Sequence, residues 1–483
     1  MQHFRITPFF YLEICPLFLL IGIALIFNFN GLYGQDAHEY LSLCRKLNEF
    51  FETGKNFSSP WFPIFYPLAG LIVSKILRSD IIAMQVVSMI SWVMAFHYFR
   101  KLMRQFFGEE KLTIPYSLLF FAFSPYILRF SLLSMSDSLC LWFLIAAYDH
   151  TFRTYKKFSP PNLIAASLYA GMAMASRYLV VIILALPLIL LAISILKLPR
   201  KEWWWLFIFA VLIIIPLLPD YLITHRILFF RLDHGRLFFN YASDAYQWNP
   251  VNFFKASFSS TDGLQHYRQW NILFVFFNWF HPAYFFPGIF LRLFIRKEDF
   301  QKPEIRWLTV VVIGYAWYLA GLRYQNMRYL ILTFPFILVI LFPAFRRAIE
   351  FLKMKISFQI ILFFVMIIQL SLFAYSSKPL YDLNHAEKEM AVTLKKFPGK
   401  TVYTCSVTGA LRSYGVPNNI FDLYLEKIDR VEPSSLLLFN EAYFPPHFAD
   451  KNPMINYNFI RSNYHLHALT NFSSGWTLYE IEN

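Results

Sequence analysis

Charged residues are scarce in this chain. Of its 483 residues only 15% are Asp, Glu, Lys or Arg, whereas 57% are hydrophobic and 20% are aromatic. A soluble globular chain carries roughly a quarter charged residues. Residues 16–29, 206–218 and 360–368 are instead almost unbroken apolar runs. The scarcity of charge therefore excludes an ordinary soluble domain and indicates a polytopic membrane protein.

Paired cysteines and a long basic face are also missing. The four cysteines, at positions 15, 44, 140 and 405, fall in different segments without paired spacing, so neither a zinc site nor a disulfide framework is indicated. The formal net charge is +14, but the Lys and Arg residues sit in short clusters between apolar runs. Such clusters are typical of membrane topology signals and do not indicate a nucleic-acid partner.

About eleven apolar runs approach the length that crosses a hydrocarbon core of roughly 30 Å. These runs cover residues 9–29, 81–99, 113–133, 137–152, 162–175, 178–196, 203–222, 271–295, 307–321, 329–345 and 357–375. The first run is too long for the core of a signal peptide, and no small-residue cleavage site follows it. We therefore expect it to remain as a membrane anchor.

The apolar stretch at residues 61–78 decides the predicted topology, because counting it as a span would move every later loop to the opposite side. Without it, every basic cluster lies on the cytoplasmic side, as the positive-inside rule requires. These clusters are Arg100, Lys101, Arg104 and Lys111; Arg153, Lys156 and Lys157; Lys197, Arg200 and Lys201; Arg292, Arg296, Lys297, Lys302 and Arg306; and Arg346, Arg347, Lys353 and Lys355. We therefore predict a proline-broken helix along the outer membrane interface.

This topology places the loops at about residues 30–79 and 224–270, the turn at residues 134–137 and the whole C-terminal tail on the exoplasmic side. The tail has mixed charge, and it predicts strands at residues 400–405, 420–424, 435–439 and 476–481 with a short helix at residues 409–415. It contains no glycine-rich phosphate loop. We thus predict a transmembrane domain over residues 1–376 and a small exoplasmic α/β domain over residues 377–483.

Three acids lie on the predicted outer side. Asp36 and Glu39, with His38 between them, directly follow the first span. Asp137 stands between two apolar runs joined by almost no loop, and an ionisable group at such depth is a functional candidate. Both Asp36 and Asp137 could instead serve as helix N-caps, since aspartate is favoured there.

Three arginines lie on the same side, and two of them, Arg323 and Arg328, oppose the positive-inside trend. Arg177, Arg323 and Arg328 all fall in short outer turns. A guanidinium binds phosphate oxygens in a bidentate manner, so an anionic ligand would explain them, although Arg177 could also be a snorkelling side chain. Glu39 could hold a divalent metal ion together with His266 or His234, but no fixed metal-ligand spacing appears.

The order and common sidedness of these features resemble the GT-C glycosyltransferases. The likeness is closest to the branch that contains protein O-mannosyltransferases and the bacterial aminoarabinose transferase. It is based on the acids after the first span, the aromatic interfacial helix, Asp137, the Arg177-Tyr178 turn and the stretch at residues 327–335. The resemblance covers residues 9–345.

The resemblance implies a polytopic GT-C-like fold and an inverting transfer of a sugar from a polyprenyl-phosphate-linked donor to a lipid, glycan or protein acceptor. It implies that no nucleotide cofactor is needed. It also implies that the site lies in the periplasm, at the outer face of a bacterial inner membrane. The catalytic residues that it implies are Asp36 as general base, Glu39 and Asp137. The substrate-binding residues would be Tyr40, Arg177, Arg323, Arg328 and Tyr329.

The chain departs from the family in two respects. Asp36 and Glu39 are separated by two residues where the family often has adjacent acids, and the aminoarabinose branch carries a lysine before a Pro-Pro pair where this chain has Ser-Ser-Pro-Trp-Phe-Pro at residues 58–63. The alternative function is a transporter or flippase of a lipid-linked saccharide. A transporter would show charged residues within spans and broken helices at matching places in two halves. The polar residues Glu13, Lys75 and Gln369 show no such symmetry.

Overall fold

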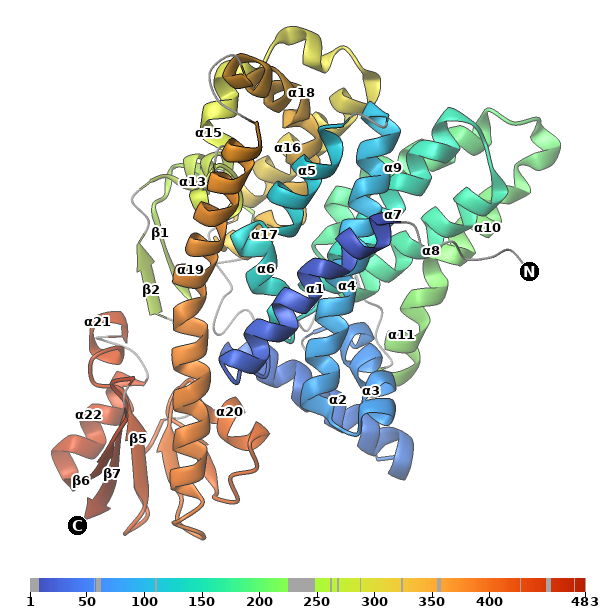
Figure 1. Ribbon diagram of the computed structural model, residues 1–483. Helices are drawn as coiled ribbons and strands as arrows, with labels where there is room; N and C mark the ends of the chain where they lie inside the picture. Colours follow the sequence, from blue (N-terminus) through green and yellow to red (C-terminus); the bar gives the residue numbers. More distant parts are fainter. Residues whose placement is uncertain are drawn as a thin grey trace.

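The computed structural model describes residues 8–55, 57, 62–108, 111–224, 248–260, 263–266, 269–286, 288–322, 325–353, 358–425, 427–448, 453–472 and 474–482. Most of these residues are helical (Figure 1). The helical elements before residue 225 are α1 (Pro8–Ile26), α2 (Gly34–Thr53), α3 (Phe65–Leu77), α4 (Asp80–Phe107), α5 (Thr113–Ser117), η1 (Leu118–Ala122), α6 (Pro125–Leu132), α7 (Asp137–Lys156), α8 (Pro160–Ser176), α9 (Val180–Leu196), η2 (Arg200–Glu202), α10 (Trp204–Ile214), η3 (Ile215–Leu217) and α11 (Leu218–Thr224).

The helical part continues beyond residue 247 and includes one hairpin. Its elements are η4 (Pro250–Phe254), the strands β1 (Ser257–Ser260) and β2 (Gly263–His266), α13 (Asn271–Asn278), α14 (Pro282–Phe285), α15 (Gly288–Leu291), η5 (Arg292–Phe294), η6 (Lys297–Phe300), α16 (Pro303–Gly321), α17 (Met327–Leu330), α18 (Phe334–Lys353) and α19 (Phe358–Leu394). The buried side chains of these helices form one large apolar core.

Several helices are suited to a membrane. Within the described residues, three helical segments are long and apolar enough to cross a bilayer, namely Asp80–Phe107, Arg200–Thr224 and Gln359–Leu394. Two sharply bent helix pairs raise this number to five if each pair is one span. The chain is thus a multi-pass integral membrane protein, whereas the predicted number of about eleven spans is not confirmed.

The predicted single span at residues 113–133 is wrong, because two helices with a break between them occupy this stretch. The π-helical turn η1 follows α5, and Pro125, which has no backbone N–H, begins α6. Gln369 of α19 donates hydrogen bonds of 2.5 and 3.1 Å to the carbonyl oxygens of Leu119 and Phe123. The amide of Gln369 therefore satisfies backbone groups at an irregular place in an apolar environment.

Two further predicted spans are interrupted. Residues 271–295 form the short helices α13, α14 and α15 followed by η5, and α14 begins at Pro282. Residues 329–345 are divided between α17 and α18, which starts at Phe334. Proline explains the start of α14, because it fixes φ and cannot continue a preceding hydrogen-bond ladder.

The stretch at residues 61–78 contains α3, which packs against α2 and α4. The helix accommodates Pro67 because this residue lies in the first turn, where its missing N–H leaves no hydrogen bond unmade. The Tyr66 hydroxyl donates to the carbonyl of Met84 at 2.8 Å and pairs with the Ser88 hydroxyl at 2.8 Å. The predicted helix is thus present, and its interfacial position stays a prediction.

The last predicted span, at residues 357–375, is only the first half of α19. This helix has 37 residues and is about 55 Å long at 1.5 Å per residue, which exceeds a hydrocarbon core of roughly 30 Å. The predicted domain boundary after residue 376 falls inside it. Figure 1 shows α19 passing without a turn from the helical part to the C-terminal sheet.

The C-terminal part is built on a mixed five-stranded sheet of order β4-β3-β5-β7-β6, in which β3 is parallel to β4 and β5 and both pairs involving β7 are antiparallel. Its elements are β3 (Val402–Thr404), α20 (Thr408–Ser413), β4 (Ile420–Asp422), β5 (Leu436–Phe439), α21 (Phe444–Phe448), α22 (Met454–Asn463), β6 (His465–Asn471) and β7 (Thr477–Glu482). Four strands and α20 agree with the prediction, whereas β6, α21 and α22 were not predicted.

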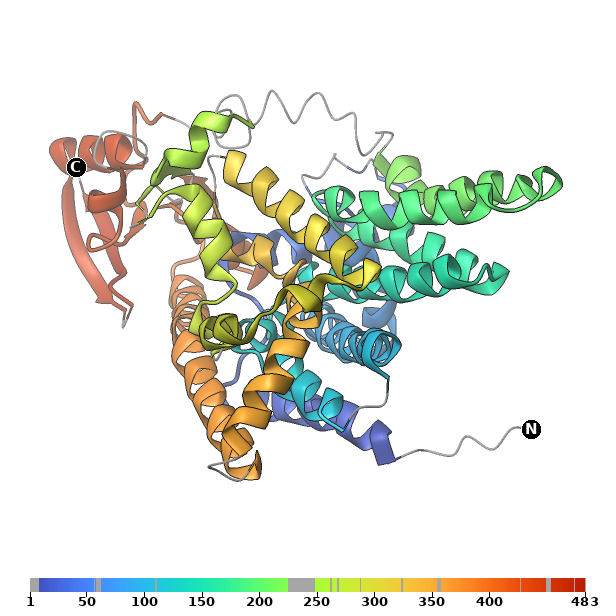
Figure 2. The same cartoon turned by 90° about the horizontal axis from the view of Figure 1, so that it is seen from above.

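The sheet has an apolar core of its own, to which α19 contributes Ala386, Met390 and Leu394. Figure 2 shows this C-terminal part at one flank of the helical part, with α10 at the opposite flank. The last turns of α19 therefore belong structurally to the sheet.

Candidate functional site

The loop between α1 and α2 lies directly against the turn that precedes α7. Gly31 has a φ of +82°, and a Cβ atom there would lie 2.6 Å from the Ser134 hydroxyl, so glycine is required. The Ser134 amide donates to the Gly31 carbonyl at 2.8 Å. Gln85 of α4 donates to the carbonyls of both Phe29 and Leu132, at 3.2 and 3.1 Å. These contacts hold the first turns of α2 and α7 side by side.

Asp36 and Asp137 both lie inside the first turn of a helix. α2 begins at Gly34 after the extended residue Tyr33, and α7 begins at Asp137 after Ser136. Neither aspartate therefore occupies the N-cap position, and the interpretation of these two acids as caps is wrong. A carboxylate in the first turn is nevertheless stabilised by the helix dipole.

Asp36, Arg328, Asp137 and Arg177 form a continuous chain of ion pairs. One terminal nitrogen of Arg328 donates to Asp36, and the Arg328 Nε donates to Asp137 at 2.7 Å. The other Asp137 oxygen accepts from Arg177. The side chain of Asp137 is 1% exposed, those of the two arginines are 11% exposed, and that of Asp36 is 39% exposed. This ion-pair chain thus has the buried carboxylate of Asp137 at its centre and the accessible carboxylate of Asp36 at its end.

The two arginines are held by the ends of other helices. Arg177 directly follows α8 in an extended conformation. Arg328 lies in α17, where the Asn326 side chain accepts the Arg328 amide at 2.9 Å and caps the helix. Residues from four separate segments therefore meet at one place, which agrees with their predicted position on a common side.

Two predicted tyrosines border this ion-pair chain. The Tyr40 hydroxyl, one helical turn after Asp36, hydrogen-bonds to the Ser136 hydroxyl at 2.8 Å. Burial raises the pKa of Tyr40 to about 12, although Arg328 and Arg177 oppose this shift, so its hydroxyl stays neutral at physiological pH. The Tyr329 ring lies 5.8 Å from the guanidinium carbon of Arg177, within the range of a cation–π contact.

Three predicted site residues do not join this group. Glu39 of α2 is half-buried, and no described residue bonds to its carboxylate. Arg323 lies outside the described residues, as does the side chain of His266 in β2. In the part of the chain that the structure describes, no three His, Cys, Asp or Glu residues gather as metal ligands. The metal ion stays a prediction.

His38 points away from the ion-pair chain and toward the C-terminal part. Its Nε2 lies 3.1 Å from a carboxylate oxygen of Glu387 in α19, and the two side chains are only 1% and 2% exposed. Asn384, one turn earlier in α19, donates to the Asn30 side chain and to the Leu32 carbonyl, both at 2.8 Å. α19 is therefore attached directly to the segment that carries Asp36.

We expect Glu387→Leu to loosen the contact between α2 and α19. The substitution leaves the buried His38 ring without its partner, which costs about 1–3 kcal/mol. Hydrogen exchange of the α2 backbone should then become faster. The matched control is Asp382→Asn, because Asp382 also lies in α19 but forms an exposed ion pair with Lys378. Equal exchange in both variants would contradict a docking role for Glu387.

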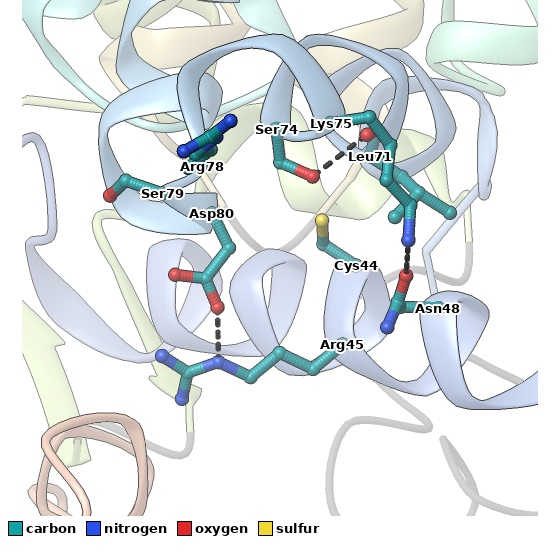
Figure 3. A pocket seen from close by; sticks show the side chains of 9 residues that line it. All are labelled: Cys44, Arg45, Asn48, Leu71, Ser74, Lys75, Arg78, Ser79 and Asp80. Carbon is teal, nitrogen blue, oxygen red and sulfur yellow. Dashed lines mark hydrogen bonds and ion pairs between the residues drawn. The ribbon is translucent and has the colours of Figure 1, made fainter. Parts of the chain in front are cut away.

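A separate cavity of about 260 Å³ lies between α2, α3 and the start of α4 (Figure 3). It is lined by Cys44, Arg45, Asn48, Leu71, Ser74, Lys75, Arg78, Ser79 and Asp80. The Arg45 Nε donates to Asp80 at 2.5 Å, and Lys75 donates to Asn48 at 2.6 Å. None of the predicted site residues lines this cavity, so we place the candidate site at the ion-pair chain.

Sequence reasoning missed Ser136 and Arg129. Ser136 is the hydrogen-bond partner of Tyr40, and no sequence signal distinguishes it from its neighbours Ser134 and Ser138. Arg129 was detectable, because a charged residue inside a predicted span is unusual.

No protein-family model and no curated protein sequence matches this chain. Among solved structures, ArnT from Cupriavidus metallidurans in the apo state matches with a TM-score of 0.58 and 12% identity, over 96% of this chain and 97% of that chain. The structure of the same enzyme bound to undecaprenyl phosphate matches with a TM-score of 0.59 and 11% identity, over 97% and 98%. The mycobacterial arabinofuranosyltransferase AftD matches with a TM-score of 0.46 and 13% identity, over 97% of this chain and 40% of that chain.

The similarity to ArnT extends over nearly the whole of both chains and includes the C-terminal sheet. The predicted resemblance is thereby confirmed at the level of the fold, in which this chain is similar to the GT-C membrane glycosyltransferases.

Proposed function

We propose that this protein transfers a sugar from a polyprenyl-phosphate-linked donor to a hydroxyl group of a lipid, glycan or protein acceptor. The observation that carries the proposal is the ion-pair chain, which ends at the half-exposed carboxylate of Asp36. The fold supports it, because the similar ArnT structure holds undecaprenyl phosphate. Because all four residues of the ion-pair chain are predicted to lie on the outer side, we propose the periplasm as the compartment of the reaction.

In this reaction the bond between the anomeric carbon and the phosphate oxygen breaks while a bond to the acceptor oxygen forms. The lipid phosphate leaves with the electron pair, and the acceptor proton passes to Asp36. Asp36 suits this role because Arg328 orients its carboxylate while 39% of the side chain stays exposed to an acceptor. Direct attack of the acceptor on the anomeric carbon inverts its configuration.

The remaining residues of the ion-pair chain position the reactants. Asp137 fixes Arg177 and Arg328 through its two oxygens, so both guanidiniums are preorganised near the place where the phosphate develops its charge. Glu39 lies three residues after Asp36 on the same side of α2 and supplies a second carboxylate close to the acceptor. Tyr40 and Tyr329 border the site.

Mass spectrometry of envelope lipids, glycans and proteins tests this proposal. A strain that lacks the gene should contain one component that is lighter by the mass of a sugar, and the wild-type gene should restore it. Purified protein should also release polyprenyl phosphate from the donor when the acceptor is present. A flippase would move the donor across vesicles without releasing phosphate, and that result would contradict the proposal.

A further inference from the structure

Arg129 in α6 is an arginine that no described carboxylate neutralises. The side chain is half-buried, and among the described residues no hydrogen bond or ion pair reaches it. Its Nε is buried without an acceptor. Burial of a charged group destabilises the folded protein unless an opposite charge compensates it. Among the described residues, no anionic group therefore compensates the charge of Arg129.

The contacts of Arg129 place it beside the ion-pair chain. Its guanidinium carbon lies 6.0 Å from the ring centre of Tyr33 and 5.7 Å from that of Tyr126. Tyr33 directly precedes α2 and stands three residues before Asp36. The Tyr126 hydroxyl donates to the sulfur of Met327 at 3.4 Å, next to Arg328. Arg129 therefore contacts the segment that leads into α2, and Tyr126 of the same helix joins it to the segment that carries Arg328.

The charges of the ion-pair chain are already balanced. Its two carboxylates, Asp36 and Asp137, face the two guanidiniums of Arg177 and Arg328. A lipid phosphate that enters this site brings negative charge that these four residues do not compensate. Arg129 is the additional cation that the described part of the site offers.

We propose that Arg129 binds the phosphate group of a lipid. A guanidinium presents paired N–H donors to phosphate oxygens, and the rings of Tyr33 and Tyr126 keep that guanidinium in place. This inference rests on the proposed function, in which the ligand is the phosphate of the polyprenyl-linked donor. The phosphate of a membrane phospholipid has the same chemistry, so the experiment must distinguish these two sources.

The experiment uses the full-length protein in nanodiscs of neutral lipid and measures binding of undecaprenyl phosphate, with undecaprenol as the uncharged control. Wild-type protein should bind undecaprenyl phosphate more tightly than undecaprenol. Arg129→Gln should weaken binding of undecaprenyl phosphate at least about tenfold, as expected for a charge-assisted hydrogen bond, and should not affect undecaprenol. Arg129→Lys should restore part of the loss.

Two controls separate binding from folding. Arg78→Gln replaces an exposed arginine that follows α3 and should bind like the wild type. Because Arg129 has no anionic partner in the described chain, Arg129→Gln should leave the melting temperature of the unliganded protein unchanged or higher. A lower melting temperature in both Arg129→Gln and Arg129→Lys would show a structural role and overturn the inference.

The remaining outcomes distinguish the hypotheses. Equal binding of undecaprenyl phosphate by wild type and Arg129→Gln would overturn the role of Arg129 and leave the proposed function standing. Wild-type protein that binds undecaprenol as tightly as its phosphate would contradict both. If phosphatidylglycerol displaces undecaprenyl phosphate equally well, and Arg129→Gln weakens both, the ligand is a phospholipid headgroup and the assignment to the donor is overturned.

Discussion

Asp36→Asn is expected to abolish sugar transfer while the protein remains folded. Loss of a positioned general base lowers the rate by about 10²–10⁴-fold. Asparagine has the same shape and keeps an oxygen that accepts from Arg328, so the fold around α2 should be preserved. The measurement is the release of polyprenyl phosphate from the donor, per molecule of folded protein.

Glu52→Gln is the matched control for Asp36→Asn. Glu52 also lies in α2 and pairs with Lys75, but its side chain is 57% exposed and it stands sixteen residues after Asp36, near the other end of the helix. Its neutralisation should leave the transfer rate unchanged. Near-normal turnover by Asp36→Asn would contradict the assignment of the base.

Asp137→Asn is expected to destabilise the protein and to stop transfer. The substitution leaves two guanidiniums, each 11% exposed, without their shared carboxylate. Removal of one partner from a buried ion pair costs about 3–5 kcal/mol. Thermal unfolding in detergent micelles should therefore show a lower melting temperature, and the folded fraction should have lost most of its activity.

The ion pair between Asp299 and Arg347 provides a comparison for Asp137. Its side chains are 5% and 17% exposed, and neither residue touches the ion-pair chain of the candidate site. Asp299→Asn should lower the melting temperature as well but leave the transfer rate per folded molecule unchanged. In the double variant Asp137→Asn/Arg177→Met, stability should partly return while transfer stays absent. Unchanged stability of Asp137→Asn would refute the central role of this carboxylate.

The sequence predicts which residues of the candidate site share one side of the membrane. The positive-inside rule places Asp36, Asp137, Arg177 and Arg328 in one compartment, and the structure brings these four together. This inference works because a membrane restricts every loop to one of two sides. Predicting which loops lie near one another therefore begins with a choice between two sides of the membrane for each loop.

Hydropathy does not reveal where an apolar run is broken or where a helix continues. Residues 113–133 read as one span, yet the helix is interrupted before Pro125. Gln369 from a distant helix donates to the carbonyls of Leu119 and Phe123 at this interruption. Arg129 lies in the same stretch, where its charge inside a predicted span was a signal that sequence reasoning did not use. Such breaks depend on tertiary hydrogen bonds, and a local window of sequence does not contain the partners.

The length of α19 connects a segment that is apolar enough to span a bilayer to α2, the helix that carries Asp36. The apolar first half of α19 is suited to a membrane span, while its second half carries part of the sheet core and the Glu387 contact to His38. Helices tilt to match the hydrocarbon thickness, so a thicker or thinner bilayer should change the angle of the whole rod. Transfer rates in bilayers of short and long acyl chains should therefore differ, and a rate independent of chain length would show that α19 transmits no tilt.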